Sequence, residues 1–418
     1  MRCEKEVVLT SDSSGEAWSA ACWDPSTGSL LMTYRNASAL PHNCVSILND
    51  SYLLAADVTK PRLHLWPLNS QNPVENLRLS TPGKVSALSC SRNGCYIAAA
   101  IGEKLFIWQT STGRLLRTVS KHYQTVTCLK FNADGAFFVS GGEDGLVFIW
   151  ALANIANDHE EPLPRHGFSD HTLPVKDIYL GNIYSKSRLI SVSLDRTARI
   201  YDTNVGTQLL VLIFRVPLTT VCMDIKECNV FFGCTDGLIR QFNLQFPPRG
   251  NEFHVSDDDE VMFKGHTGNI TCLSVSIDCT TLLSGGSDGI VNLWDIPSHQ
   301  IVRRIPHKGP ITTAIFSSAN ENYRAMSFKP KILVRPLQRV AKENGKNEII
   351  EIISKHDDYN SFLNVEHYLE SNSSSEVSMK KSIQDELQIE KLKNINKELY
   401  KHLVNHLCKK TVINTDEN

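Results

Sequence analysis

The chain has 418 residues, which is long enough for two or three domains, or for one large repeat domain followed by a tail. Hydrophobic residues make up 41% of it and charged residues 21%, a composition that excludes a mainly disordered chain. The formal net charge of −2 excludes a surface built throughout to bind nucleic acid, so an RNA contact would have to be a local patch.

Targeting signals and cysteine usage limit the cellular compartments in which the protein is expected. No apolar run approaches the roughly 18 residues that a membrane helix needs, and Met1–Thr10 has no hydrophobic signal core. The 12 cysteines are scattered and include no C-x-x-C pair, so they do not indicate a secreted disulfide framework. We therefore expect a protein of the cytosol or nucleus with no membrane partner.

A repeat sets the architecture. Apolar segments that end in an aromatic residue recur at intervals of 41–52 residues, at Trp23, Trp66, Trp108, Trp150, Tyr201, Phe242 and Trp294. Four short strands fill about 40–45 residues in a WD-type propeller blade, and polar insertions at 153–170 and 246–260 account for the two longest intervals. The pattern predicts an all-β protein.

A set of polar residues recurs at fixed offsets inside these repeats. Residues 18, 22 and 28 positions after a histidine are Ser, Asp and Trp in two repeats, and a third keeps Ser, Asp and an aromatic residue after a longer loop. The three sets are His122, Ser140, Asp144 and Trp150; His266, Ser284, Asp288 and Trp294; and His171, Ser191, Asp195 and Tyr201. Ser, His and Asp together also occur in hydrolases, but a catalytic triad occurs once per site, whereas this set recurs. We interpret the sets as structural tetrads that hold strands together, and we predict no catalytic residue, metal site or cofactor.

Counting blades gives seven. Six sets of three inner strands are expected near 41–68, 83–110, 125–152, 173–203, 218–244 and 269–296. A seventh begins at 307–316, and the N-terminal stretch 6–35 lacks a complete blade of its own. We therefore predict a seven-bladed propeller over 1–337 whose last blade combines both ends, which leaves no free sheet edge. Residues 322–337 could supply strands or merely pass across this blade.

The tail has a different composition. Residues 338–375 are expected to form a polar linker, and 376–410 to form an amphipathic helix without Gly or Pro. Its apolar stripe consists of Ile383, Leu387, Leu392, Ile395, Leu399, Leu403 and Leu407. Such a stripe must be buried, either in a coiled coil with a second copy or a partner subunit, or against its own propeller. We favour association with another chain.

Basic residues gather just before this tail. The stretch 324–346 carries seven Lys or Arg residues against one Glu, among them Lys329, Lys331, Arg335 and Arg339. It is either a solvated linker or a contact patch for RNA phosphates or an acidic partner.

The whole chain resembles the WD repeat-containing protein 18 family, whose fungal counterpart is the WD subunit of the complex that processes internal transcribed spacer 2. The resemblance rests on KHYQTVTCLKF (121–131), SGGEDGLVFIWAL (140–152), PRHGFSDHTLPVKDIY (164–179), FKGHTGNITCLSVS (263–276), HKGPITTAIF (307–316) and LQIEKLKNINKELY (387–400). The last segment is the most telling, because a generic WD protein lacks it. The linker 338–375 departs from the family pattern.

The resemblance implies a non-enzymatic scaffold in maturation of the large (60S) ribosomal subunit, located in the nucleolus and nucleoplasm. Implied partners are a helical-repeat scaffold subunit, an AAA ATPase remodeller and spacer nuclease machinery of an assembly called the rixosome, together with the pre-ribosomal particle and its RNA. The family also pairs through its C-terminal region, which implies a homodimer. The alternative is a substrate receptor or chromatin-associated interaction module on the same fold, because a propeller alone does not name a function.

Overall fold

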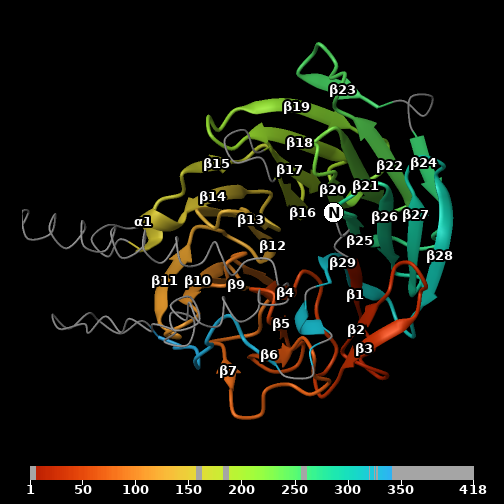
Figure 1. Ribbon diagram of the computed structural model, residues 1–418. Helices are drawn as coiled ribbons and strands as arrows, with labels where there is room; N and C mark the ends of the chain where they lie inside the picture. Colours follow the sequence, from red (N-terminus) through yellow and green to blue (C-terminus); the bar gives the residue numbers. More distant parts are fainter. Residues whose placement is uncertain are drawn as a thin grey trace, which may run out of the picture. The chain divides into compact units, whose positions relative to one another are not determined.

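The strands form a ring of seven sheets around a central axis (Figure 1). The computed structural model describes residues 6–156, 162–181, 188–255, 261–319, 321–323, 325 and 328–340. All neighbouring strands within a sheet are antiparallel except for one added outer strand, β23, which pairs with β19 in parallel. This architecture confirms the predicted seven-bladed propeller. The predicted helix over 376–410, with its seven apolar residues, lies outside the described residues.

Blades 1 to 3 follow one another along the chain. Blade 1 contains β4 (Val45–Leu48), β5 (Tyr52–Ala56), β6 (Arg62–Pro67) and β7 (Leu79–Ser80). Blade 2 contains β8 (Ala87–Cys90), β9 (Tyr96–Ile101), β10 (Lys104–Gln109) and β11 (Leu115–Ser120). Blade 3 contains β12 (Val126–Phe131), β13 (Phe137–Gly142), β14 (Val147–Ala151) and β15 (His166–Phe168), with the short helix α1 (Leu152–Ala156) after β14.

Blades 4 to 6 continue around the ring. Blade 4 contains β16 (Val175–Leu180), β17 (Arg188–Ser193), β18 (Thr197–Asp202), β19 (Gln208–Ile213) and β23 (Glu252–His254). Blade 5 contains β20 (Leu218–Met223), β21 (Asn229–Cys234), β22 (Leu238–Asn243) and β24 (Val261–Lys264). Blade 6 contains β25 (Ile270–Val275), β26 (Thr281–Gly286), β27 (Ile290–Asp295) and β28 (Gln300–Pro306).

Blade 7 joins both ends of the propeller sequence. It contains β1 (Glu6–Asp12), β2 (Ala20–Trp23), β3 (Leu30–Tyr34) and, as its inner strand, β29 (Ile311–Ser318). The register of β1 and β29 runs from Glu6 opposite Ser318 to Asp12 opposite Ile311. The first and last strands of the ring are thus held together by a full antiparallel ladder, which satisfies backbone groups that would otherwise form an open edge.

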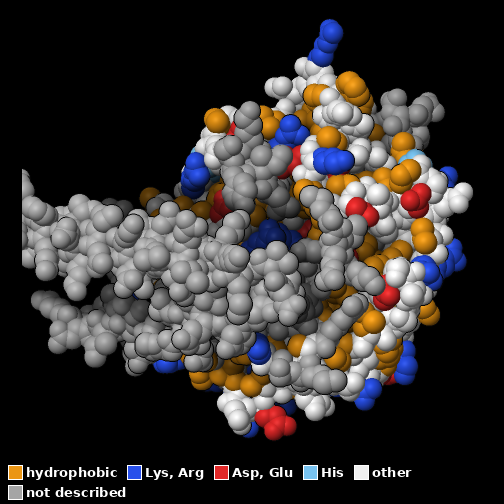
Figure 2. All heavy atoms as spheres, in the orientation of Figure 1, with side chains coloured by type: hydrophobic (Ala, Val, Ile, Leu, Met, Phe, Trp, Pro, Cys, Tyr) orange, Lys and Arg blue, Asp and Glu red, His pale blue; other side chains and the backbone are white. Residues whose placement is uncertain are grey.

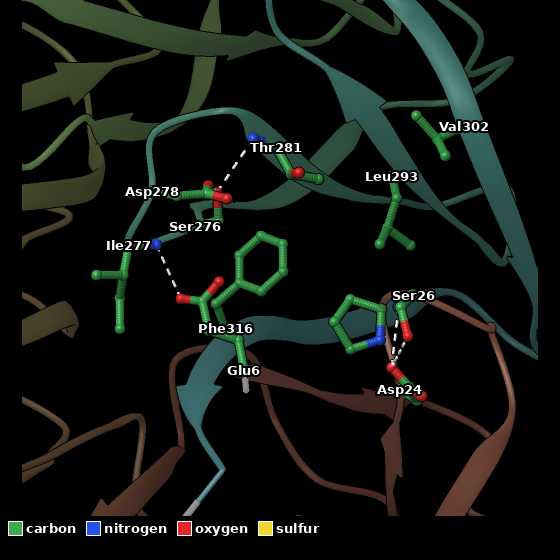
Figure 3. Close-up of a pocket in the computed structure, with 11 residues that line it drawn as sticks. Glu6, Asp24, Ser26, Ser276, Ile277, Asp278, Thr281, Leu293, Val302 and Phe316 are labelled. Atoms are coloured by element: carbon green, nitrogen blue, oxygen red, sulfur yellow. Dashed lines mark hydrogen bonds between the residues drawn. The ribbon is translucent and has the colours of Figure 1, made fainter. Parts of the chain in front are cut away.

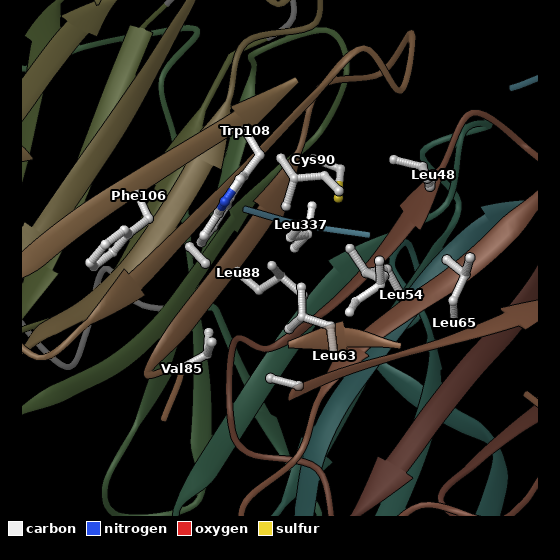
Figure 4. Packing of buried hydrophobic residues seen from close by; sticks show 14 of the residues in the cluster. Leu48, Leu54, Leu63, Leu65, Val85, Leu88, Cys90, Phe106, Trp108 and Leu337 are labelled. Carbon is white, nitrogen blue, oxygen red and sulfur yellow. The ribbon is translucent and has the colours of Figure 1, made fainter. Parts of the chain in front are cut away.

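The core consists of seven apolar clusters, one between each pair of adjacent blades. The middle strands carry Val, Ile, Leu, Phe and Ala on both faces because each face packs on a neighbouring blade. Figure 4 shows the cluster between blades 1 and 2, where Leu54 and Leu65 of one blade face Leu88 and Trp108 of the next. Each blade therefore depends on both neighbours for its buried surface.

Beyond β29 the described chain supplies no further strand. It makes one 3-10 turn, η1 (Glu321–Tyr323), and then crosses blades 1 and 2 as an extended segment, 328–340, which we call the strap. Of the two alternatives for 322–337, passage across the propeller is the one observed, although the strap lies on blades 1 and 2 rather than on blade 7. Its contacts include Gln338, the first residue of the predicted linker.

Candidate functional site

The tetrad of blade 6 is a continuous chain of hydrogen bonds. The indole Nε1 of Trp294 donates to Ser284 Oγ at 2.8 Å, and Ser284 Oγ lies 2.7 Å from His266 Nε2. On the other side of the ring, His266 Nδ1 lies 3.0 Å from Asp288 Oδ2. Because a carboxylate only accepts, Nδ1 carries the proton, so Nε2 of the neutral ring accepts from the serine hydroxyl. The chain fastens the turn that contains Asp288 to the middle of the blade.

Blade 3 repeats this geometry. Trp150 Nε1 donates to Ser140 Oγ at 2.9 Å, Ser140 Oγ lies 2.8 Å from His122 Nε2, and His122 Nδ1 lies 3.0 Å from Asp144 Oδ2. Burial lowers the pKa of His122, which favours the neutral ring that the hydrogen bonds require. The structure thus brings together all four predicted residues in both blades.

Blade 4 departs from the pattern at its aromatic residue. His171 still lies between Ser191 Oγ (2.7 Å) and Asp195 Oδ2 (2.9 Å). The phenol of Tyr201, however, donates to Asp170 at 3.1 Å. A phenol oxygen lies farther from the backbone than an indole nitrogen, so Tyr201 also reaches the entry loop of its blade, which the tryptophans of blades 3 and 6 do not.

These Ser–His–Asp sets are not arranged for nucleophilic catalysis. Ser140, Ser191 and Ser284 are all fully buried, so no substrate can reach their hydroxyl oxygens. A nucleophile must lie next to a space for the reacting group. We assign the sets a structural role.

Asp288→Ala should therefore lower the free energy of unfolding by about 1–3 kcal/mol, because it leaves the buried His266 and two backbone N–H groups without their acceptor. A urea titration followed by tryptophan fluorescence measures the effect. Asp134→Ala, at an exposed turn, is the matched control and should change the value by less than about 0.5 kcal/mol. Unchanged stability of Asp288→Ala would contradict the structural role.

Blade 1 holds a polar network that the sequence did not predict. Asp57 is buried, and its carboxylate accepts from Ser38 Oγ (2.5 Å), Thr59 Oγ1 (2.7 Å), Arg62 Nε (3.1 Å) and His64 Nε2 (3.1 Å). These hydrogen bonds hold the pKa of Asp57 well below its usual range, although burial acts in the opposite direction. As in the tetrads, an aspartate anchors a turn, but its partners come from the turn itself (Thr59), from the preceding loop (Ser38) and from β6 (Arg62 and His64).

The closing blade has an incomplete version of the tetrad. Trp23 Nε1 donates to Thr10 Oγ1 at 2.8 Å, as tryptophan does to serine in blades 3 and 6. His307 precedes β29 as the other histidines precede their blades. Its side chain is fully buried, packs edge-on against Trp18 and Trp23, and places Nδ1 4.0 Å from Asp12 Oδ2. Neither ring nitrogen has a hydrogen-bond partner in the described part of the chain, and burial lowers the pKa of His307. Aromatic packing therefore replaces the missing hydrogen bonds.

The predicted basic residues lie on the strap. Its apolar side chains Val334 and Leu337 are buried in the cluster between blades 1 and 2. The carbonyl oxygen of Gln338 accepts from Trp108 Nε1 at 2.7 Å, which supplies the partner that blade 2 lacks within its own sequence. Lys329, Lys331, Arg335 and Arg339 are all exposed, and Lys331 Nζ lies 3.6 Å from Asp50. The strap thus fixes the backbone of a basic surface instead of being a free linker.

The ring axis contains a cavity of about 280 Å³, lined by the inner strands of all seven blades. Figure 2 shows Lys or Arg side chains at the centre of this face. Lys130 and Asp177 both line the cavity, and Asp177 accepts from Thr220 Oγ1 at 2.7 Å. His42, also in the lining, donates from Nδ1 to a backbone carbonyl, and burial lowers its pKa. Because the cavity lining carries charges of both signs, and because Asp177 and His42 are already hydrogen-bonded, it favours neither an anion nor a cation as a ligand.

The described residues offer no candidate metal centre, since no three His, Cys, Asp or Glu side chains among them are grouped to hold an ion. Burial raises the pKa of Cys128 and of Cys272 to about 12, so these inner-strand thiols stay protonated and act as small apolar side chains. Neither α1 nor η1, the helices of the described ranges, is long and apolar enough to cross a membrane.

A closed ring of sheets fastened by recurring His–Ser–Asp–Trp sets defines a WD-repeat β-propeller. The family model described as "WD domain, G-beta repeat" matches residues 113–151 and 257–295. The chain is 38% identical over 336 residues to WD repeat-containing protein 18 of Homo sapiens, covering 79% of this chain and 77% of the relative. It is 36% identical over 352 residues to the protein of that name from Danio rerio, covering 83% and 80%. The chain therefore belongs to the WD repeat-containing protein 18 family, which confirms the resemblance found in its sequence.

A fungal relative extends the comparison. The chain is 28% identical over 372 residues to a Yarrowia lipolytica protein named Pre-rRNA-processing protein IPI3, covering 84% of this chain and 85% of the relative. The similarity therefore covers most of both chains rather than single WD motifs.

Proposed function

We propose that this protein is a non-catalytic scaffold subunit of a nuclear complex that acts in pre-rRNA spacer processing and maturation of the large ribosomal subunit. The observation that carries the proposal is the similarity over most of the chain to a fungal relative named for pre-rRNA processing. The chain is also 36–38% identical to two members of its own family. Function on a propeller must be argued from more than the fold, because the same ring has many uses.

The scaffold role is supported by how the ring is built. Seven inter-blade clusters and a paired closing blade make a rigid body. Its buried Ser–His–Asp sets hold together the strands and turns of single blades. What remains exposed is a set of loops, outer strands and the basic strap. Rigid surfaces of this kind bind partners without paying much ordering entropy.

The proposed partners are a helical-repeat scaffold subunit, an AAA ATPase remodeller and spacer nuclease machinery, met through propeller surfaces and through the helix 376–410. The exposed side chains of Lys329, Lys331, Arg335 and Arg339 would face RNA phosphates or acidic protein of the pre-ribosomal particle. Self-association through the helix would place two propellers in one complex.

Affinity purification of the tagged full chain tests this function. Large-subunit assembly factors and spacer-containing pre-rRNA should dominate the recovered material, and depletion should cause spacer-containing precursors to accumulate. Recovery of ubiquitin-ligase subunits or chromatin proteins with normal pre-rRNA levels would favour the alternative interaction module and contradict the proposal.

Replacing Leu392, Ile395 and Leu399 by Asp should abolish self-association and reduce recovery of the complex at least tenfold, because the three residues lie at the centre of the apolar stripe. Light scattering of the full chain measures the oligomer, and the melting temperature of the propeller should not change. The matched control replaces Asn394, Lys397 and Lys401 by Asp on the opposite face of the same helical period. An unchanged oligomer in the first variant would show that the stripe packs elsewhere.

A further inference from the structure

A groove of about 630 Å³ lies between blades 6 and 7 (Figure 3). Its walls come from the start of β1, the end of β29 and the β2–β3 turn on one side. On the other side they come from the β25–β26 turn, β27 and β28. These are the strand ends opposite the turns that hold Asp12 and Asp288, so the groove lies away from the tetrad ends of both blades.

The floor and one wall of the groove are apolar. Pro25, Ile277, Leu293, Val302 and Phe316 line it. Both Val302 and Ile277 are largely exposed, at 59% and 54%, although they lie in a concave site. A ligand in the groove would cover these two apolar side chains. Figure 3 shows Leu293, Val302 and Phe316 around the same space. A volume of this size matches sites that enclose several side chains.

All charged residues in the lining are acidic. They are Glu6, Asp24 and Asp278, and no Lys or Arg is among the lining residues that the structure describes. Glu6 accepts from the backbone N–H of Ile277 at 2.8 Å, while Asp24 accepts from its own turn at Ser26. Burial, and to a smaller extent the neighbouring Asp278, raises the pKa of Glu6, although the hydrogen bond from the Ile277 N–H acts in the opposite direction.

Contacts between the two blades keep the groove open. The Glu6–Ile277 hydrogen bond joins β1 to the β25–β26 turn at one end. At the other end, the guanidinium of Arg303 on β28 donates to the carbonyl oxygen of Ser26 in the β2–β3 turn. The arginine is therefore engaged across the gap between the blades, and a ligand would meet preformed walls rather than loops that must first be ordered.

We propose that this groove binds a short segment of a partner protein in which a Leu, Ile or Phe side chain stands next to a Lys or Arg. The apolar side chain would cover Val302 and Phe316, and the cation would lie between the carboxylates of Glu6 and Asp278. Charge complementarity selects this occupant, because the three carboxylates in the described lining repel acidic peptides and RNA. The proposal rests on the proposed scaffold function in that it names a surface for one partner subunit.

Selection from a displayed library of random heptapeptides on the purified full chain tests the groove without any ribosomal component. Selected peptides should be enriched in an apolar residue adjacent to Lys or Arg. Their affinity should fall about tenfold or more for Val302→Glu and for the double variant Glu6→Gln with Asp278→Asn. The matched controls Val205→Glu, at an exposed apolar site on blade 4, and Glu103→Gln, at an exposed turn, should bind as the unchanged chain does.

The proposal would be overturned by selected peptides without the basic residue, by equal binding of groove and control variants, or by the absence of any selected peptide. Loss of peptide binding by Val302→Glu counts only if its melting temperature is unchanged, and the double variant, which adds no charge, provides the second reading. Peptides that bind the groove only after residues 376–410 are deleted would identify this chain's own tail as the occupant and refute an external partner. Because pre-rRNA processing is not measured, failure here leaves the proposed function standing, and failure of that function leaves the peptide result standing.

Discussion

Asp57→Ala is expected to lower the free energy of unfolding by about 2–4 kcal/mol, because a buried carboxylate that accepts several hydrogen bonds is removed. The carboxylate is 1% exposed and accepts from Ser38, Thr59, Arg62 and His64, so several hydrogen bonds are lost together. The buried His64 is left without its acceptor, whereas Thr59 and Arg62 are exposed and can bind water instead. A urea titration at neutral pH measures the change. Asp134→Ala, at an exposed turn, is the control and should stay within about 0.5 kcal/mol of the unchanged protein.

The same network predicts the direction of a pH dependence. The pKa of Asp57 is lowered in the folded protein, so the unfolded chain binds this proton more readily. The stability that Asp57 contributes is therefore fully present above the unfolded pKa of roughly 3.9 and is lost as pH falls towards the lower folded value. Between about pH 5 and pH 3 the difference in stability between the original protein and Asp57→Asn should shrink. A difference that stays constant or grows over this interval would contradict the network.

The blades could be predicted from sequence because their information is local. Alternating β-branched strands, Gly–Asp turns and a terminal aromatic residue recur in each repeat. The three inner strands of each of blades 1 to 6 fall within the predicted ranges, whereas the outer strands lie outside them. The closing blade was predictable for a different reason: an incomplete blade at each end leaves one economical solution, and the β1–β29 ladder confirms it.

The parts that the sequence did not predict depend on other spacings or on distant contacts. Asp57 and His64 stand in a different order from the recurring His–Ser–Asp sets, so an offset search does not find them. His307 and Thr10 come from opposite ends of the propeller sequence, so no fixed offset along the chain relates them. They also form no hydrogen bond with each other in the described part of the chain. The indole of Trp108 finds its acceptor 230 residues away in Gln338, within a stretch whose composition resembles a linker. Only the packed structure brings these groups together.

Leu337→Asp is expected to detach the strap and to lower the free energy of unfolding by about 3–5 kcal/mol, because it places a charge in the apolar cluster between blades 1 and 2 (Figure 4). Release of the strap also removes the carbonyl acceptor of Trp108 and exposes the face of that indole. Tryptophan emission should therefore shift to longer wavelength before global unfolding, in a urea titration that resolves the two events.

Leu333→Asp is the matched control, since this strap residue is 51% exposed and points away from the cluster. It carries the same added charge. The emission wavelength should not change, and the free energy of unfolding should stay within about 0.5 kcal/mol of the original value. If Leu337→Asp leaves the emission wavelength and the free energy of unfolding as unchanged as Leu333→Asp does, the strap does not contribute to the core. Its basic side chains would then have no fixed backbone from which to contact RNA or an acidic partner. If only Leu337→Asp releases the strap and also reduces recovery of pre-ribosomal RNA, the packing of one leucine links propeller stability to the basic surface.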